Sequence, residues 1–354
     1  MQKPEEKKLE DAIVKARNSL SSDRLDMSFG ELISMYTSNE LVIDPEFQRL
    51  FRWDSHQQTR FIESLLLGIP IPSVFIAEDS EGRWELVDGL QRMSTILSFF
   101  GLLKDNSSKN NWALEKGDIV EELENLDIEK LPLKFRLNIK RSACRIEIIK
   151  WDSEYDLRFE LFNRLNTGGS PLTDQEIRNC IFRGISVDFT QTIKDLAATE
   201  RFIGLIQPTS RQKEQLYLDE LVLRFFSLFE NHNNIKKNLS DHMTDYMKDA
   251  TEDKNKYEYK IDIFKRTLQL VSQLGKESIR GKNNLLSTSL YDGIFNGIAA
   301  NIGYFEENVD ISEYKVEQLK NDQEFKKASG QLSNSKDRTK KRIIRALKVF
   351  SPDE

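Results

Sequence analysis

A carboxylate, a glycine and an arginine occur close together in the segment LVDGLQR at residues 86–92. The residues before Asp88 are typical of a strand and residues 93–103 of a helix, so the segment lies where a strand passes into a helix. Free backbone N–H groups at a helix start attract anions, and Arg92 would add paired contacts to phosphate oxygens. Asp88 could then hold a metal ion or accept a proton. A structural alternative stays open, in which Asp88 caps the helix, Gly89 makes the turn and Arg92 pairs with a neighbour.

A second segment, DPEFQR at residues 44–49, is followed by FRW at residues 51–53. Gln48 and Arg49 therefore stand among aromatic side chains, a composition typical of phosphate or base contacts combined with stacking. An equal alternative is that the aromatic side chains fill the core and the arginines remain solvated.

A third segment, FNRLNTGGSP at residues 162–171, follows a predicted helix over residues 154–165. Gly168 and Gly169 permit positive φ angles and a cup of backbone N–H groups, while Asn163 and Asn166 offer amide contacts. A plain helix cap needs one glycine and no pair of asparagines, so this composition favours a binding loop.

The C-terminal residues 336–348 contain seven Lys or Arg and a single acidic residue, Asp337. A cationic helix of this kind can lie along a phosphate backbone, although charge runs are more often solvated faces. The predicted DNA contacts are Lys340, Lys341, Arg342 and Arg345. The residues expected on the inner side of the helix are Ile343, Ile344, Leu347 and Phe350.

The composition excludes several classes of protein. The 354 residues include 52 Lys or Arg and 58 Asp or Glu, a net charge of −6, so a globally basic nucleic-acid coat is excluded while a local basic face is not. The two cysteines form no CxxC pair, so neither a zinc ribbon nor a disulfide framework is expected. The most apolar stretch, residues 65–77, is interrupted by glycine and proline and is shorter than the roughly 20 residues of a membrane span. We expect a cytoplasmic protein.

The elements that must position these segments indicate an α+β fold with a small mixed sheet and flanking helices. Strands are predicted at residues 41–43, 73–77, 83–87 and 144–149, and the second and third of these form a hairpin. Beyond about residue 182 the apolar residues recur at helical spacing. The expected domains are an N-terminal arm or helix at residues 1–24, a nucleotide-binding domain at 25–182 and a helical domain at 183–354. The helix that opens at Thr173 could belong to either half.

Taken in order, the first three segments resemble the N-terminal domain of GmrSD-type modification-dependent restriction systems. That family is related to the ParB nuclease fold and recurs in phage-defence proteins such as SspE. The resemblance spans residues 41–179, and the downstream segment LDELVLRFF at residues 218–226 resembles the helical extension of the family.

The resemblance implies a ParB-like domain that binds an NTP with Mg²⁺ and hydrolyses it to gate the cleavage of foreign DNA. It implies catalytic roles for Asp88, Gln91 and Arg92, with Asp88 also as the metal ligand. The residues implied in nucleotide binding are Gln48, Arg49, Gly89, Asn163, Asn166, Gly168 and Gly169. Leu90 stands where the family motif has glutamine.

The chain offers only His56, His232 and His242, which cannot supply the HNH nuclease that accompanies the family. We therefore expect the nuclease in a partner protein, and oligomerisation is possible. Two alternatives stay open: a non-catalytic DNA-binding scaffold or regulator, and a direct DNA nickase.

Overall fold

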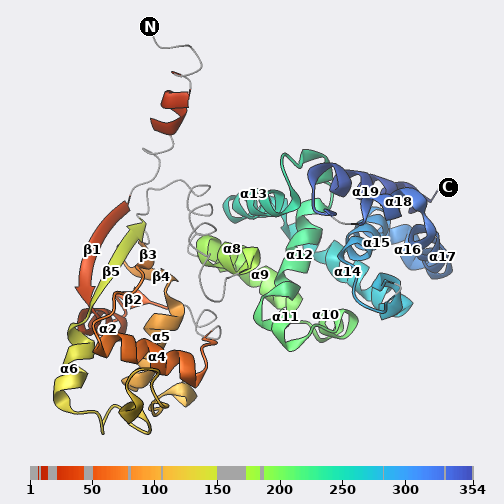
Figure 1. Ribbon diagram of the computed structural model, residues 1–354. Coiled ribbons are helices and arrows are strands. Elements are labelled where there is room, and N and C mark those ends of the chain that lie inside the picture. The colour runs from red at the N-terminus through yellow and green to blue at the C-terminus, as the bar shows by residue number, and fades with distance from the viewer. Residues whose placement is uncertain are drawn as a thin grey trace. The chain divides into compact units, whose positions relative to one another are not determined.

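The computed structural model describes residues 7, 9–14, 22–43, 51–78, 81–104, 107–149, 173–183, 187–281, 283–330 and 332–352. The chain divides into two compact units, Met1–Pro171 and Leu172–Glu354, of which the first contains the sheet and the second is helical (Figure 1). This organisation confirms the expected α+β class with a helical C-terminal part. The helix expected at residues 154–165 lies outside the described residues.

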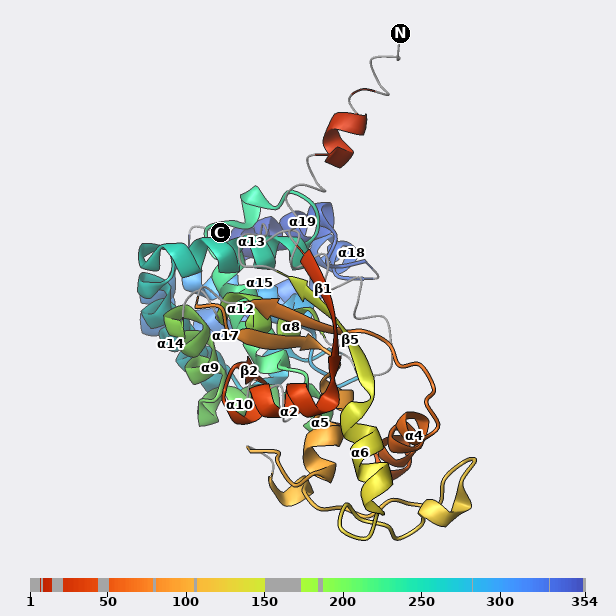
Figure 2. The ribbon, with the colours of Figure 1, turned by 90° about the vertical axis from the view of Figure 1, so that its left-hand side faces the viewer.

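The first unit contains a mixed sheet with the strand order β1-β5-β3-β4-β2. Its strands are β1 (Ser22–Ser28), β2 (Leu41–Val42), β3 (Val74–Glu78), β4 (Trp84–Asp88) and β5 (Ala143–Ile149). The strands β3 and β4 form the predicted antiparallel hairpin, whereas β5 pairs with β3 and β2 pairs with β4 in parallel. The edge strand β1 runs antiparallel to β5, and the two lie side by side in Figure 2. The sequence does not predict β1, because its residues SDRLDMS are mostly polar.

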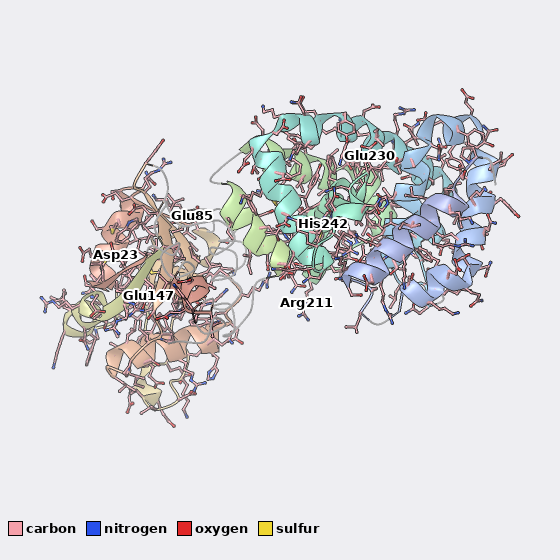
Figure 3. All side chains as sticks on the ribbon, turned by 90° about the horizontal axis from the view of Figure 1, so that it is seen from above. Asp23, Glu85, Glu147, Arg211, Glu230 and His242 are labelled. Atoms are coloured by element: carbon pink, nitrogen blue, oxygen red, sulfur yellow. The ribbon has the colours of Figure 1, made fainter. Side chains whose placement is uncertain are left out.

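The polar residues of β1 form charged pairs with β5 across the sheet. Arg145 Nε lies 3.1 Å from Asp26 Oδ1, and Arg24 Nε lies 2.8 Å from Glu147 Oε2, a residue labelled in Figure 3. The members of each pair stand directly opposite one another in the strand register. Cross-strand pairs of opposite charge stabilise a sheet, so the polar composition of β1 is compatible with its place at the edge.

Among its described residues, the same unit contains the helices α2 (Phe29–Thr37), α4 (Ser55–Leu66), α5 (Leu90–Phe99) and α6 (Leu133–Arg141), and residues 9–14 near the N-terminus are also helical. Ser28 caps the start of α2, and Asp54 caps α4 in a reciprocal capping box. The apolar side of α4 packs through Phe61, whose ring centroid lies 6.2 Å from that of Phe29 and 5.6 Å from that of Trp53. Helices α2 and α4 thus begin at a capping residue and turn an apolar side toward the core.

The second unit is built from helices. They are α8 (Asp174–Arg183), α9 (Val187–Ala197), α10 (Glu200–Ile206), α11 (Ser210–Glu214), α12 (Tyr217–Leu228), α13 (Leu239–Glu252), α14 (Glu258–Leu274), α15 (Thr288–Ala300), α16 (Ile302–Glu307), α17 (Val309–Asn321), α18 (Gln323–Ala328) and α19 (Lys336–Val349). Helix α12 packs against α9, α13 and α15, while α19 packs against α15 and α18. The core of the second unit is aromatic, and Phe225, Phe264 and Phe295 are in mutual ring contact there.

A buried group of charges joins three of these helices. Arg224 of α12 donates two hydrogen bonds to Asp292 of α15, at 3.0 and 2.6 Å, and Arg342 of α19 donates a third at 2.8 Å. All three side chains are almost completely buried. Removing the Asp292 carboxylate would leave the buried guanidinium groups of Arg224 and Arg342 without the anion that they share. Asp292 is therefore a strong determinant of where α19 packs.

Helix α8 belongs to the second unit, which answers the question that the sequence left open. Thr173 and Glu176 form a capping box at its start, with the Thr173 N–H donating to Glu176 Oε2 at 2.6 Å. Arg178 is fully buried and donates to Thr244 Oγ1 and to the carbonyl of Ser240, both in α13, at 3.0 Å. The compact units therefore divide after Pro171, and the domain boundary near residue 182 stays a prediction.

Within the described ranges, every helix falls short of the length and hydropathy that are needed to cross a membrane.

Candidate functional site

The segment at residues 86–92 passes from β4 to α5, as its sequence predicts. Strand β4 carries a bulge near its end, because Leu86 pairs with Ile76 while Asp88 pairs with Phe75. Two residues of β4 therefore stand opposite one residue of β3, and both Leu86 and Val87 are buried. The bulge brings the strand to its end at Asp88, whose side chain is 41% exposed.

Gly89 makes the turn between the strand and the helix. Its φ angle is +97°, a left-handed conformation that favours glycine. A Cβ atom at this position would lie 2.8 Å from Cγ2 of Val74 and 3.4 Å from Nη2 of Arg92. Glycine is therefore required both by the backbone angle and by the close approach of the neighbouring strand.

Arg92 connects the turn to the chain that enters β3. Its Nη2 donates to Asp88 Oδ2 at 2.9 Å, and its Nη1 donates to the carbonyl of Ser73 at 3.0 Å and to that of Pro72. The Arg92 side chain is only 12% exposed, whereas Asp88 is the more open member of the pair. The Arg92 guanidinium is therefore held in place by the backbone, while the Asp88 carboxylate with which it pairs is accessible to solvent.

Gln91 holds the segment that follows the DPEFQR motif. Its Oε1 accepts hydrogen bonds from the backbone N–H groups of Arg52, at 2.9 Å, and Trp53, at 3.0 Å. Gln58 Nε2 donates to the Trp53 carbonyl at 2.7 Å, so both sides of this short segment are fixed. The Lys109 ammonium lies over the Phe51 ring, 4.7 Å from its centroid. The structure thus brings the DGLQR turn next to Arg52 and Trp53, which follow the second segment in the sequence.

The start of α5 has the character of an anion site. Gly89 provides no side-chain cap, and the first intrahelical hydrogen bond runs from the Met93 N–H to the Gly89 carbonyl. The N–H groups of the first turn lie at the positive end of the helix dipole, next to the Arg92 guanidinium. Leu90 is 6% exposed, so the position at which the chain departs from the family motif points into the core.

The donor set suits a magnesium ion that is held mainly by phosphates. Among the residues that the structure describes, no group of three or more His, Cys, Asp or Glu could form a metal site by itself. Mg²⁺ is commonly bound through one or two carboxylates together with substrate phosphates and water. The exposed Asp88 carboxylate fits such a role.

Cys144 lies in β5 and is completely buried. Burial raises the pKa of its thiol to about 11, although the nearby charge of Arg92 acts in the opposite direction. At neutral pH the side chain is a neutral thiol rather than a nucleophile.

The remaining residues that were predicted to bind nucleotide lie outside the described residues: Gln48, Arg49, Asn163, Asn166, Gly168 and Gly169.

The contacts of the site that sequence reasoning missed involve mainly backbone atoms: the Arg52 and Trp53 N–H groups and the Pro72 and Ser73 carbonyls. Every residue type offers such atoms, so the sequence carries no signal for the carbonyls. The proximity of Arg52 and Trp53 to the second motif is the one available hint.

The predicted DNA-contacting residues of α19 differ in their accessibility. Lys341 is exposed and Lys340 is half-buried. Arg342 is completely buried with Asp292, so the expectation that it contacts DNA is corrected: its guanidinium is enclosed in the protein. Arg345 donates to Asp322 Oδ2 at 2.9 and 2.6 Å and is 30% exposed. Ile344, expected on the inner side, is 51% exposed.

Residues 29–183 match a family model described as "GmrSD restriction endonuclease, N-terminal domain". The matched region begins with α2, contains the turn at Asp88 and ends with α8. No curated protein and no solved structure matches the chain.

Proposed function

Residues 29–183 are a GmrSD-type N-terminal domain, which points to a restriction or phage-defence protein, and from this premise we propose that the turn at residues 88–92 binds a nucleoside triphosphate. We further propose that hydrolysis of this triphosphate controls the cleavage of foreign DNA by a nuclease partner. The observation that carries the proposal is the Asp88–Arg92 pair at the uncapped start of α5.

Arg92 is suited to bind phosphate because its position is already fixed. Two carbonyls hold its Nη1, so little side-chain freedom remains to be lost when a phosphate binds. Phosphate oxygens would compete with Asp88 for Nη2 and would also accept from the N–H groups at the start of α5. Binding would thereby release the Asp88 carboxylate from its present partner.

Asp88 would take up Mg²⁺ or accept a proton from the attacking water. The ion supplies charge neutralisation on the phosphates when it is bound. Gln91 acts in this proposal as a positioning residue, because its carboxamide oxygen holds the Arg52–Trp53 backbone beside the turn. The burial of Leu90 supports the proposal, since a leucine there leaves the exposed side of the turn unchanged.

The test is nucleotide binding and phosphate release by the full chain, compared with Asp88→Asn and Arg92→Lys. We expect Arg92→Lys to weaken binding of ATP or GTP about tenfold, because a single ammonium lacks the separate, rigidly placed Nη1 and Nη2 donors that hold the side chain and face the phosphate. Asp88→Asn should lower phosphate release by about 100-fold or more, because the substituted amide can neither bind Mg²⁺ well nor accept the proton. Matched controls are Asp26→Asn and Arg145→Lys, which alter an exposed Asp–Arg pair of the same sheet. Equal nucleotide binding by the wild type and both site variants would contradict the proposal.

A non-catalytic DNA-binding protein is the second candidate, favoured by the exposed Lys341 on the basic helix α19. It predicts no binding and no hydrolysis of any NTP. The nucleotide-binding and phosphate-release assays therefore separate the two functions, whether or not the chain also binds DNA.

A further inference from the structure

A basic groove of about 700 Å³ lies between α18 and α19 of the second unit. Its charged lining residues are Lys327, Arg338, Lys341, Arg345, Lys348 and Glu324. Ala328 and Ile344 provide the apolar part of the lining. The two helices lie side by side (Figure 1), and they pack directly against one another.

The cations of α19 form a row because of their spacing. Arg338, Lys341, Arg345 and Lys348 follow one another at intervals of three, four and three residues, which places them on one side of a helix. Over ten residues at 1.5 Å each, the row extends for roughly 15 Å. The buried Arg342–Asp292 pair fixes the rotation of α19 about its axis, so the row is held at the surface.

The charge of this region is opposite to that of the rest of the chain. Residues 323–349 contain nine Lys or Arg and two Asp or Glu, a net charge of +7. The whole chain carries −6, so the remaining residues carry −13. Of the lining residues, Glu324 lies 3.4 Å from Arg345 and offsets its charge. Asp322, which is outside the lining and just before the counted range, lies 2.6 Å from Arg345 and offsets it further. Lys327, Lys341 and Lys348 are exposed and add to the positive charge of the groove.

We propose that this groove binds the sugar-phosphate backbone of double-stranded DNA. An extended row of cations matches a polymer of phosphates, since B-DNA carries one charge for about every 1.7 Å of its axis. Ile344 is 51% exposed beside the row and would contact the apolar part of the deoxyribose. The contacts lie along the backbone, so the groove positions DNA and does not read its sequence. The inference is independent of the nucleotide site, because it concerns different residues and requires no NTP.

The experiment measures binding of the full chain to a fluorescent duplex of about 20 base pairs, by anisotropy, over a range of salt concentrations and without nucleotide. The groove variant is the triple substitution Lys327→Gln, Lys341→Gln and Lys348→Gln. The control is Lys213→Gln, Lys236→Gln and Lys265→Gln, which removes the same charge from exposed positions elsewhere in the second unit. All six side chains are exposed, so both variants should fold, and circular dichroism checks this.

We expect the groove variant to bind more than tenfold more weakly at low salt. The slope of log K against log salt should fall by about 2.7, the value for three lost phosphate contacts. The control variant should bind within about twofold of the wild type.

Three outcomes would overturn the proposal. One is an equal loss of binding in the two triple variants, which would indicate a response to net charge alone. Another is full competition by millimolar inorganic phosphate or ATP, which would indicate a site for single anions. The third is clear preference for a double-stranded RNA of the same length, which would assign the groove to a different polymer.

Discussion

At the scale of single residues, the turn between β4 and α5 depends on a glycine that has no substitute. Gly89 combines a positive φ angle with close approach to Val74, and each condition alone disfavours a side chain. Asp88 precedes this glycine and is partly exposed, whereas Arg92 follows it and is largely buried. A change at Gly89 would therefore alter the geometry of the candidate site without removing any of its polar groups.

Gly89→Ala should destabilise the protein by about 2 kcal/mol or more, since backbone strain and overpacking add. Gly82→Ala is the matched control, because Gly82 also has a positive φ angle, +80°, but no neighbour within 4 Å of an added Cβ. It should cost only the strain, about 1 kcal/mol. Urea unfolding followed by tryptophan fluorescence measures both free energies. Equal effects of the two substitutions would show that the contact with Val74 contributes nothing.

At the scale of elements, the short apolar strands and the hairpin follow from their sequences, with ends displaced by about one residue. The edge strand β1 does not, because Asp26 and Arg24 have their partners Arg145 and Glu147 more than a hundred residues later in the chain. The inner side of α19 is the second example. A helical pattern assigns Ile344 to the core and Arg342 to solvent, whereas Asp292, fifty residues earlier, holds Arg342 inside.

As with the fold, only a part of the candidate site could be predicted from the local sequence. The residues of the turn at 88–92 could be named in advance, because a strand, a glycine and a helix follow one another directly in sequence. The attachment of Gln91 to Arg52 and Trp53 could not, because it joins backbone groups 38 and 39 positions away. Nothing in the local pattern distinguishes this glutamine from an exposed one.

Gln91→Leu should loosen the segment at residues 51–54 because two backbone N–H groups lose their acceptor. The expected cost is about 1–3 kcal/mol for each N–H that finds no new acceptor. Hydrogen exchange measured by mass spectrometry should show faster exchange at Arg52 and Trp53, with little change in α6. Gln191→Leu, on the exposed side of α9, is the control, since the Gln191 side chain donates to Asp195 on its own helix and, among the described residues, bonds no backbone N–H group. Unchanged protection of residues 51–54 would contradict the assigned role of Gln91.

At the scale of the whole molecule, the helical unit contains two buried histidines. His242 Nε2 lies 2.9 Å from the Ser227 carbonyl, and this residue is labelled in Figure 3. Burial lowers the pKa of both His232 and His242 from the usual value near 6.5. The unfolded chain therefore binds protons at a pH where the folded chain does not, so the free energy of unfolding decreases as the pH falls through 6.5.

The melting temperature should fall between about pH 7.5 and about pH 5.5, with each histidine contributing at most about 1.4 kcal/mol per pH unit. His242→Gln should reduce this dependence, because the variant has one fewer buried group that protonates on unfolding. His56→Gln, at an exposed position in α4, controls for the loss of an imidazole. Scanning calorimetry at constant ionic strength measures the effect. A pH dependence of His242→Gln that matches the wild type would rule out this contribution.

The membership of α8 in the second unit has a practical consequence for dividing the protein into expressible fragments. A fragment cut at residue 183, where the family match ends, would carry Arg178 away from Ser240 and Thr244. The complementary fragment would lose a helix that packs against α12 and α13 and would expose their apolar surface to water. Cleavage near residue 171 keeps α8 with its neighbours, so fragments divided there should remain more soluble than fragments divided at the homology boundary.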